Sequence, residues 1–198
     1  MERLIECGKV EEIVFARFQP GEDILYALYD ICRKKDIKTG VSLDGSGGAV
    51  DFTYQHFPIN PKLCPTNVSI GTMPGKCELS IHGTIGSTVC NLKEGETPDQ
   101  VVDRMFPTIP GLWEGPKEKW PMVGCEYGPG TPYIHAHCVA SNADYTVCGH
   151  LMPGTKVASG DPTKPSHFTV IIAKVSGVEL QATIDHEIGF YQNLVRTE

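Results

Sequence analysis

Apolar positions along the chain follow two periods, which predict one main helix and many strands. Between residues 23 and 36 the apolar residues recur at helical spacing, with acidic residues at the start and three basic residues at positions 33–35, a polarity that suits the helix dipole. Strand patterns are predicted within the segments 7–19, 38–54, 76–86, 134–140, 145–150, 166–175 and 180–194. One helix followed by many short strands indicates an α+β domain with a mostly antiparallel sheet, a single domain over residues 1–198.

Two segments interrupt these patterns. A glycine cluster at residues 44–48 divides the segment 38–54 into two expected strands, and the proline-rich segment 57–75 is expected to be a loop. The glycine cluster does not precede a helix and lacks the lysine of a phosphate-binding loop, so a tight bend or a close backbone approach is the better interpretation than nucleotide binding.

Residues 88–131 form the least regular part of the chain, rich in glycine and proline, with a short helix expected at 98–105. So long an irregular stretch inside a compact domain is usually functional, as a lid, a pocket wall or an oligomer contact. Trp113 and Tyr133 could serve as pocket walls, although aromatic residues at such positions are more often plain packing.

Three histidines dominate the candidate chemistry. His135 and His137 are separated by one residue, so on a strand both side chains point to the same face. If residues 134–140 and 145–150 pair as a hairpin, His150 returns beside the first strand. Three imidazoles with an open position are what a catalytic zinc or a similar divalent ion needs. A histidine pair alone is more often a solvated surface pair; the third histidine makes the metal interpretation as strong as that alternative.

Four other residues are candidates for catalysis. Glu78 and His82 share one face of their strand and could supply a general base or a fourth contact, although a solvated strand face explains them equally well. Glu187 is another candidate for proton transfer. The guanidinium of Arg17 could clamp a substrate carboxylate, although an ion pair with the acids at positions 22–23 is its more ordinary role.

Charge and composition limit which binding partners and which cellular location we expect. The formal net charge is −7 over 198 residues, and the only basic block is at 33–35, which counts against DNA as the main ligand. The eight cysteines are scattered without a C-x-x-C pair, and most of them are interpreted as small buried hydrophobes. No run approaches the roughly 18 apolar residues of a membrane helix, and the N-terminus lacks an export signal, so we expect a cytoplasmic protein without membrane contact.

Several segments, in this order, resemble the plant-and-prokaryote-conserved (PPC) domain, which in plants accompanies AT-hook nuclear proteins. The matching segments are residues 17–23, 45–49, 78–85, 135–137 and 148–151, followed by Gly154. This resemblance implies an α+β fold on an antiparallel sheet, assembled as a homotrimer. The chain departs from the family by lacking an AT-hook core and by carrying the insertion at 88–131.

The spacing of His135, His137 and His150 also resembles that of acetolactate decarboxylase, a zinc enzyme in which three histidines hold the metal. Only these three positions carry over from that comparison; the substrate does not.

The leading functional hypothesis is a metal-dependent enzyme, a lyase, decarboxylase or C–C bond hydrolase acting on a small oxo acid or related carbonyl compound. A divalent ion, with zinc as the first expectation, would polarise the carbonyl as a Lewis acid. The alternatives are a non-enzymatic regulatory or DNA-associated trimer, and a sensor that binds a small ligand in the same pocket without turnover.

Overall fold

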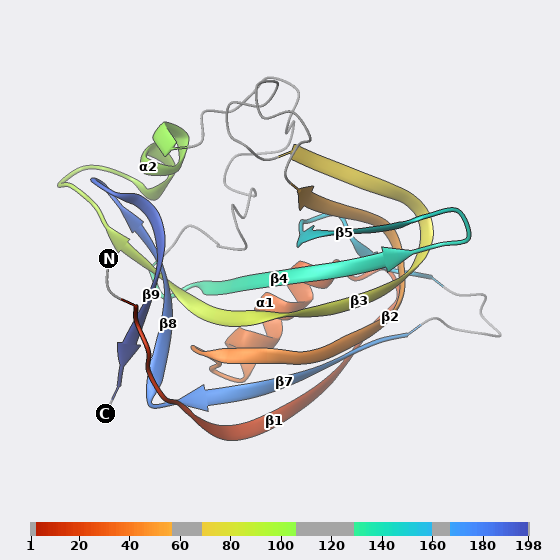
Figure 1. Ribbon diagram of the computed structural model, residues 1–198, viewed down its shortest axis with the longest axis horizontal. Helices are drawn as coiled ribbons and strands as arrows, with labels where there is room; N and C mark the ends of the chain where they lie inside the picture. Colours follow the sequence, from red (N-terminus) through yellow and green to blue (C-terminus); the bar gives the residue numbers. More distant parts are fainter. Residues whose placement is uncertain (1–2, 57–68, 106–128, 160–166, 198) are drawn as a thin grey trace.

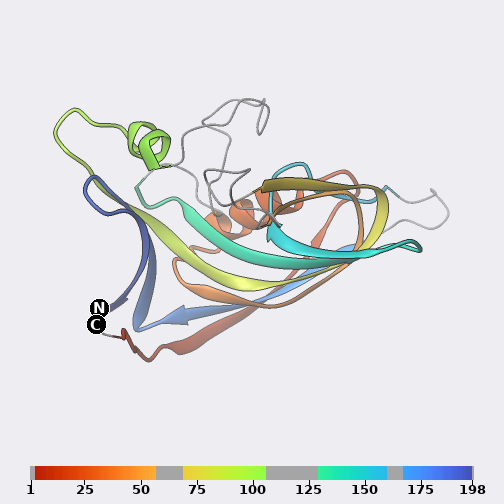
Figure 2. The same ribbon diagram turned by 45° about the horizontal axis from the view of Figure 1, so that its top comes forward.

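The computed structural model describes residues 3–56, 69–105, 129–159 and 167–197. It contains one large, strongly curved sheet with the helix α1 (Ile24–Lys34) packed against one face (Figures 1 and 2). The strands are β1 (Lys9–Phe18), β2 (Gly40–His56), β3 (Ser69–Asn91), β4 (Pro132–Ser141), β5 (Thr146–Leu151), β6 (Lys156–Val157), β7 (Phe168–Ser176), β8 (Val178–Asp185) and β9 (Gly189–Arg196). Their order is β1-β7-β2-β5-β4-β3-β8-β9, with β6 beside β2. The pairing is antiparallel except for β3 with β8, so the expected mostly antiparallel sheet with one main helix is confirmed.

The helix α1 forms where the sequence predicts it. Asp23 is its N-cap, and its carboxylate accepts hydrogen bonds from the backbone N–H groups of Leu25 and Tyr26, which satisfies two donors that a helix start otherwise leaves open. The buried face carries Leu28 and Tyr29 into the core of the sheet. Covering the sheet on this side leaves its opposite face available for other roles.

The strands β2 and β3 differ from the sequence prediction. The glycine cluster does not interrupt a strand, because β2 runs unbroken through it, and β3 begins at Ser69 inside the segment expected to be a loop. The cluster serves a close approach of two backbones: a Cβ on Gly47 would lie 2.1 Å from the carbonyl oxygen of His167. The two strands pair along most of their length and bend at a bulge beside Asp51.

The bend closes four strands into a ring. From β2 the pairing passes to β3, then to β4 and β5, and β5 returns to the far end of β2 through Tyr54–Leu151 and Gln55–His150. In Figure 1 the ends of β2 and β3 curl back over β5. The predicted hairpin of β4 and β5 is therefore confirmed, and it forms one wall of this ring.

The hairpin β8–β9 extends the sheet at the opposite end, next to β3 (Figure 1). The predicted short helix in the irregular region is confirmed as α2 (Pro98–Met105). Residues 106–128 of that region, including Trp113, lie outside the described residues. No helix within the described ranges is long and apolar enough to cross a membrane.

Candidate metal centre

The strand register brings the three predicted ligands together. His137 of β4 lies opposite His150 of β5, and His135 is two positions along β4. Each histidine offers one ring nitrogen, and these three nitrogens lie within 4.8 Å of one another. Histidine, cysteine, aspartate and glutamate are the side chains that usually bind metals. Among those in the described residues, these three histidines form the group whose geometry fits a metal ion.

The rings are arranged with their nitrogens converging. The Nε2 atoms of His135 and His137 are 3.0 Å apart, and the ring of His150 stands edge-on to both, with centroid distances of 5.2 and 5.5 Å. Gly149 permits this placement, because a Cβ there would lie 2.7 Å from the carbonyl oxygen of Gln55 on β2. The glycine before His150 therefore lets β5 close the ring of strands against β2.

The electrostatics of the three rings suit a cation. Burial is the main cause that lowers the pKa of His150, to about 3, with His135 and His137 adding to the effect. Burial also lowers the pKa of His135 and His137, each with a smaller contribution from a neighbouring histidine. The three rings are therefore neutral near pH 7 and have the lone pairs that metal coordination requires.

His150 provides the test of whether the residues fit a metal. Its side chain is 5% exposed, and its Nε2 atom has no hydrogen-bond partner among the described residues. A buried polar atom without a partner is costly, so such an atom usually has a ligand or a functional role. A divalent ion shared with His135 and His137 would satisfy it, and the donor set of three imidazoles fits such an ion.

Two residues that the sequence did not single out as a pair surround His135. The Nδ1 atom of His135 lies 2.8 Å from the Tyr133 hydroxyl and 2.8 Å from the Gln192 amide nitrogen. The Gln192 amide also hydrogen-bonds the Tyr133 hydroxyl. No sequence signal marks Gln192, which comes from β9 and lies far along the chain from β4.

Gln55 is a second residue that the sequence did not indicate. It lies opposite His150 in the pairing of β2 with β5, so both side chains point to the same side of the sheet. Its Oε1 atom is buried and has no hydrogen-bond partner in the described ranges. Gln55, His150 and His137 form one row across three strands, and His82 of β3 continues it.

Among the four predicted catalytic residues, His82 lies nearest the centre. It is paired with His137, and their ring centroids are 6.5 Å apart. Its side chain is exposed on the face that carries His135 and His137. His82 is therefore placed to contact a ligand held by the three histidines.

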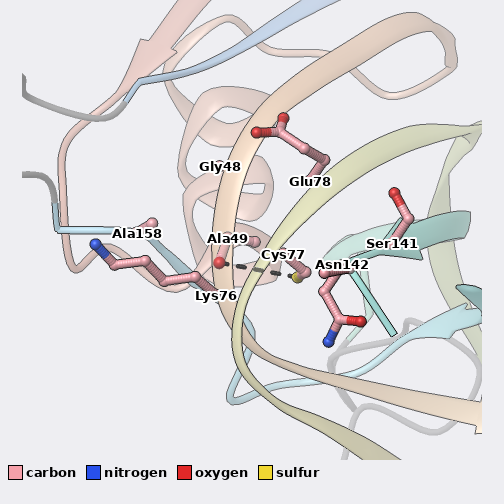
Figure 3. Close-up of a pocket in the computed structure, with 9 residues that line it drawn as sticks. Gly48, Ala49, Lys76, Cys77, Glu78, Ser141, Asn142 and Ala158 are labelled. Carbon is pink, nitrogen blue, oxygen red and sulfur yellow. Dashed lines mark hydrogen bonds between the residues drawn. The ribbon is translucent and has the colours of Figure 1, made fainter. Parts of the chain in front are cut away.

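Glu78 lies on the same face of β3 as His82 but is four positions away, roughly 13 Å at the usual rise of a strand. It lines a separate pocket of about 440 Å³ together with Lys76, Ser141 and Asn142 (Figure 3). None of the three histidines lines this pocket. Direct proton transfer at the metal centre is thus beyond the reach of Glu78.

Glu187 and Arg17 also lie outside the centre. Glu187 is in the turn between β8 and β9, where its carboxylate is 3.5 Å from the ring of His186. Arg17 is exposed on the edge strand β1 and is separated from β5 by β7 and β2 in the strand order. Its expected partners have other contacts: Asp23 caps α1, and Glu22 accepts a hydrogen bond from the backbone of Gln19.

Comparison with known proteins confirms the expected family resemblance. The model of the Plants and Prokaryotes Conserved (PCC) domain, also written PPC, matches residues 5–98. The three histidines lie beyond the matched residues. None of the curated proteins compared with the chain matches it.

Solved structures show the same fold over nearly the whole chain. A PPC protein of Pyrococcus horikoshii is 13% identical with a TM-score of 0.60, covering 98% of this chain and 99% of its own. A metal-containing protein of Archaeoglobus fulgidus is 11% identical with a TM-score of 0.60, covering 99% and 100%. A protein of Ralstonia eutropha JMP134 with a provisional DNA-binding assignment is 16% identical with a TM-score of 0.56, covering 92% and 90%.

The fold is thus that of a PPC protein. In this chain it carries a group of three histidines able to hold a metal ion.

Proposed function

We propose that this PPC-type protein binds a divalent metal ion through His135, His137 and His150 and uses it to act on a small carbonyl compound. The observation that carries the proposal is the buried, unpartnered Nε2 atom of His150 beside two further neutral imidazoles. The description of the Archaeoglobus fulgidus relative as metal-containing supports it. Zinc is the first candidate, because tetrahedral imidazole sites with one open position suit it.

The chemistry follows from the charge of the site. A bound divalent ion acts as a Lewis acid on a coordinated carbonyl or carboxylate oxygen. Because the three imidazoles are neutral, they offset none of the ion's formal charge, which favours an anionic oxygen ligand such as an oxo acid. The exposed ring of His82, next to His137 on the same face, can hydrogen-bond that ligand or exchange a proton with it.

We infer that the reaction class is that of a lyase, a decarboxylase or a C–C bond hydrolase. Each of these reactions leaves negative charge on an oxygen next to the bond that breaks, which is the charge that a Lewis acid stabilises. Glu78 and Glu187 have no part in this proposal, because Glu78 lines a separate pocket and Glu187 lies in the turn between β8 and β9. A sensor would bind the same ligand without consuming it.

The first experiment is elemental analysis of the protein purified without a metal-affinity tag, beside the double variant His135→Ala/His137→Ala. We expect about one divalent ion per chain in the wild type, since three ligands define one site, and none in the double variant. Absence of metal from the wild type, even after incubation with zinc, manganese and nickel salts, would exclude the metal centre. If metal is present, loss of oxo acids from a substrate pool distinguishes an enzyme from a sensor.

A DNA-associated role is the second candidate, because a relative of the same fold carries a provisional DNA-binding assignment. The formal net charge of −7 opposes it, because binding to a phosphate backbone requires a basic surface. Such a role predicts an affinity for duplex DNA that falls steeply with salt. Absence of binding at low salt would remove this candidate without affecting the metal centre.

We further propose that the protein assembles as a homotrimer, as the family resemblance implies. The sheet face opposite α1 exposes large apolar side chains, with Ile13 at 43%, Phe15 at 70% and Val41 at 40%. The strand register continues this row of side chains from Val41 to Thr84 and then to His135 on the neighbouring strands. Large exposed apolar areas are typical of interaction sites, so Phe15→Asp should convert a trimer into monomers in sedimentation analysis. A monomeric wild type would exclude the trimer.

A further inference from the structure

We propose that Tyr133 and Gln192 position His135 for metal binding through hydrogen bonds that can reverse direction. This inference rests on the proposed metal centre and adds two residues that hold no metal themselves. It concerns the ring nitrogen of His135 that faces away from the other histidines.

The geometry divides the two nitrogens of His135 between two environments. Its Nε2 atom points toward His137, at 3.0 Å from the Nε2 atom of that ring. Its Nδ1 atom is 2.8 Å from the Tyr133 hydroxyl and 2.8 Å from the Gln192 amide. Tyr133 and Gln192 therefore hold the ring at Nδ1, and Nε2 is the nitrogen available to the metal.

The metal-free arrangement is consistent with one direction of these bonds. The amide N–H of Gln192 donates to the Tyr133 oxygen, and in this arrangement the Tyr133 O–H donates to Nδ1 of His135. In this arrangement Nδ1 is an acceptor, so the proton of the neutral ring resides on Nε2. That proton can then be donated to His137 across the 3.0 Å separation.

Metal binding requires the opposite arrangement. A metal ion takes the lone pair of Nε2, so the proton of the neutral ring must move to Nδ1. Nδ1–H then needs an acceptor, and the Tyr133 oxygen can become one by rotating its O–H toward Gln192. The carboxamide of Gln192 can in turn present its oxygen instead of its nitrogen, because both groups occupy nearly the same volume.

Hydroxyl and carboxamide groups are suited to this exchange because each can both donate and accept. A lysine or arginine in place of Gln192 could only donate and would oppose metal binding. A glutamate could only accept, which favours the proton on Nδ1 that the metal-bound ring requires. This difference between glutamate and an apolar residue separates a role in positioning His135 from a role in packing.

The two residues come from different parts of the fold, which gives the C-terminal hairpin a role in the site. Tyr133 is fully buried and packs edge-on against Phe190 of β9. Gln192 lies two positions farther along β9, with an exposed side chain. The hairpin β8–β9 therefore contributes a hydrogen-bonding group to a centre built on β4 and β5.

The experiment compares Gln192→Leu, Gln192→Glu and Tyr133→Phe with the wild type, using zinc affinity by chelator competition. Asn193→Asp is the control for Gln192→Glu, because it adds the same charge one residue along β9, on the other side of the strand. The visible spectrum of the cobalt-loaded proteins reports the coordination geometry. The melting temperature of each metal-free variant reports whether the fold is intact.

We expect Gln192→Leu and Tyr133→Phe each to weaken zinc binding by about 10-fold or more, the usual effect of removing a partner of a ligating histidine. Gln192→Glu should bind zinc at least as tightly as the wild type and more tightly than Asn193→Asp. Because Gln192 is exposed, its variants test the inference even if Tyr133→Phe fails to fold.

Equal zinc affinity and equal cobalt spectra for Gln192→Leu and the wild type would overturn the inference while leaving the metal centre in place. The same conclusion follows if Gln192→Glu weakens binding as much as Gln192→Leu. A wild type that binds neither zinc nor cobalt would overturn the proposed function, and this inference with it.

Discussion

The histidine centre and the turn between β8 and β9 both contain several ionisable side chains. They differ in whether the polar atoms of these side chains have hydrogen-bond partners. In the turn, the Oδ1 atom of Asp185 accepts hydrogen bonds from the backbone N–H groups of Glu187 and Ile188, each at 2.8 Å. Its Oδ2 atom accepts one from Asn91 at 2.5 Å. In the centre, the buried Nε2 atom of His150 has no partner in the described residues.

The same contrast extends to the neighbours of each group. The guanidinium of Arg104 donates to the backbone carbonyl of His186 at 3.0 Å and pairs with Glu96 at 2.7 Å, so the turn ties α2 to the end of the sheet. Beside His150, the Oε1 atom of Gln55 is also buried without a partner. A cluster whose atoms satisfy one another stabilises the fold, whereas a cluster of histidines with buried unpartnered atoms is a candidate binding site.

The largest expected effect comes from replacing His150 by leucine. Metal binding should be lost, because one of three ligands is removed. The metal-free protein should keep or gain thermal stability, because the change removes a buried nitrogen that has no partner. Elemental analysis and thermal unfolding of the metal-free protein measure the two effects. A variant that loses stability but keeps its metal would mean that His150 stabilises the fold and does not bind the metal.

Replacing Asp185 by alanine should give the opposite pattern. The backbone N–H groups of Glu187 and Ile188 lose their acceptor, and Asn91 loses its partner. We therefore expect a lower melting temperature with zinc affinity unchanged, as chelator competition would show. Loss of zinc binding in a variant that remains folded would mean that the turn belongs to the metal centre.

The pH dependence of stability offers a finer comparison for Asp185. Hydrogen bonds from the backbone of Ile188 and Glu187 are the main cause that lowers its pKa below the usual 3.8. A carboxyl group with a lowered pKa in the folded state stabilises the fold above the unfolded pKa, and this contribution is lost as the pH falls through the folded value. Acid unfolding below about pH 4 should therefore contain a component that Asp185→Ala lacks. Identical acid profiles would show that the turn does not stabilise the ionised carboxylate.

The sequence predicted the grouping of the three histidines better than it predicted their surroundings. His135, His137 and His150 could be grouped because alternation within a strand and the length of a hairpin are local properties of the chain. Gln55 and Gln192 could not be found in this way, since their proximity to the histidines depends on the closing of the strand ring and on the docking of β9. No local pattern encodes either contact.

The same limit explains the error in the strand bounds and the separation of the catalytic candidates. The extension of β3 back to Ser69 depends on pairing with β2, which overrides the loop-like composition of that segment. Glu78 and His82 share a face, as alternation predicts, but only the register shows that His82 is the one beside His137. Periodicity fixes which face a side chain occupies, whereas the register fixes its neighbours.

The smallest expected effect belongs to Glu187→Gln. Its carboxylate is largely exposed and contacts only the ring of His186 among the ion pairs in the described part of the chain. An exposed pair of this kind contributes little, so the free energy of unfolding should change by less than about 0.5 kcal/mol.

Zinc affinity should also be unchanged in Glu187→Gln, whereas His82→Ala, next to His137, should alter the binding of an oxo acid to the zinc-loaded protein. Titration calorimetry with one oxo acid on both variants measures this difference. A larger effect from Glu187→Gln than from His82→Ala would mean that the turn, rather than the row of histidines, contacts the ligand.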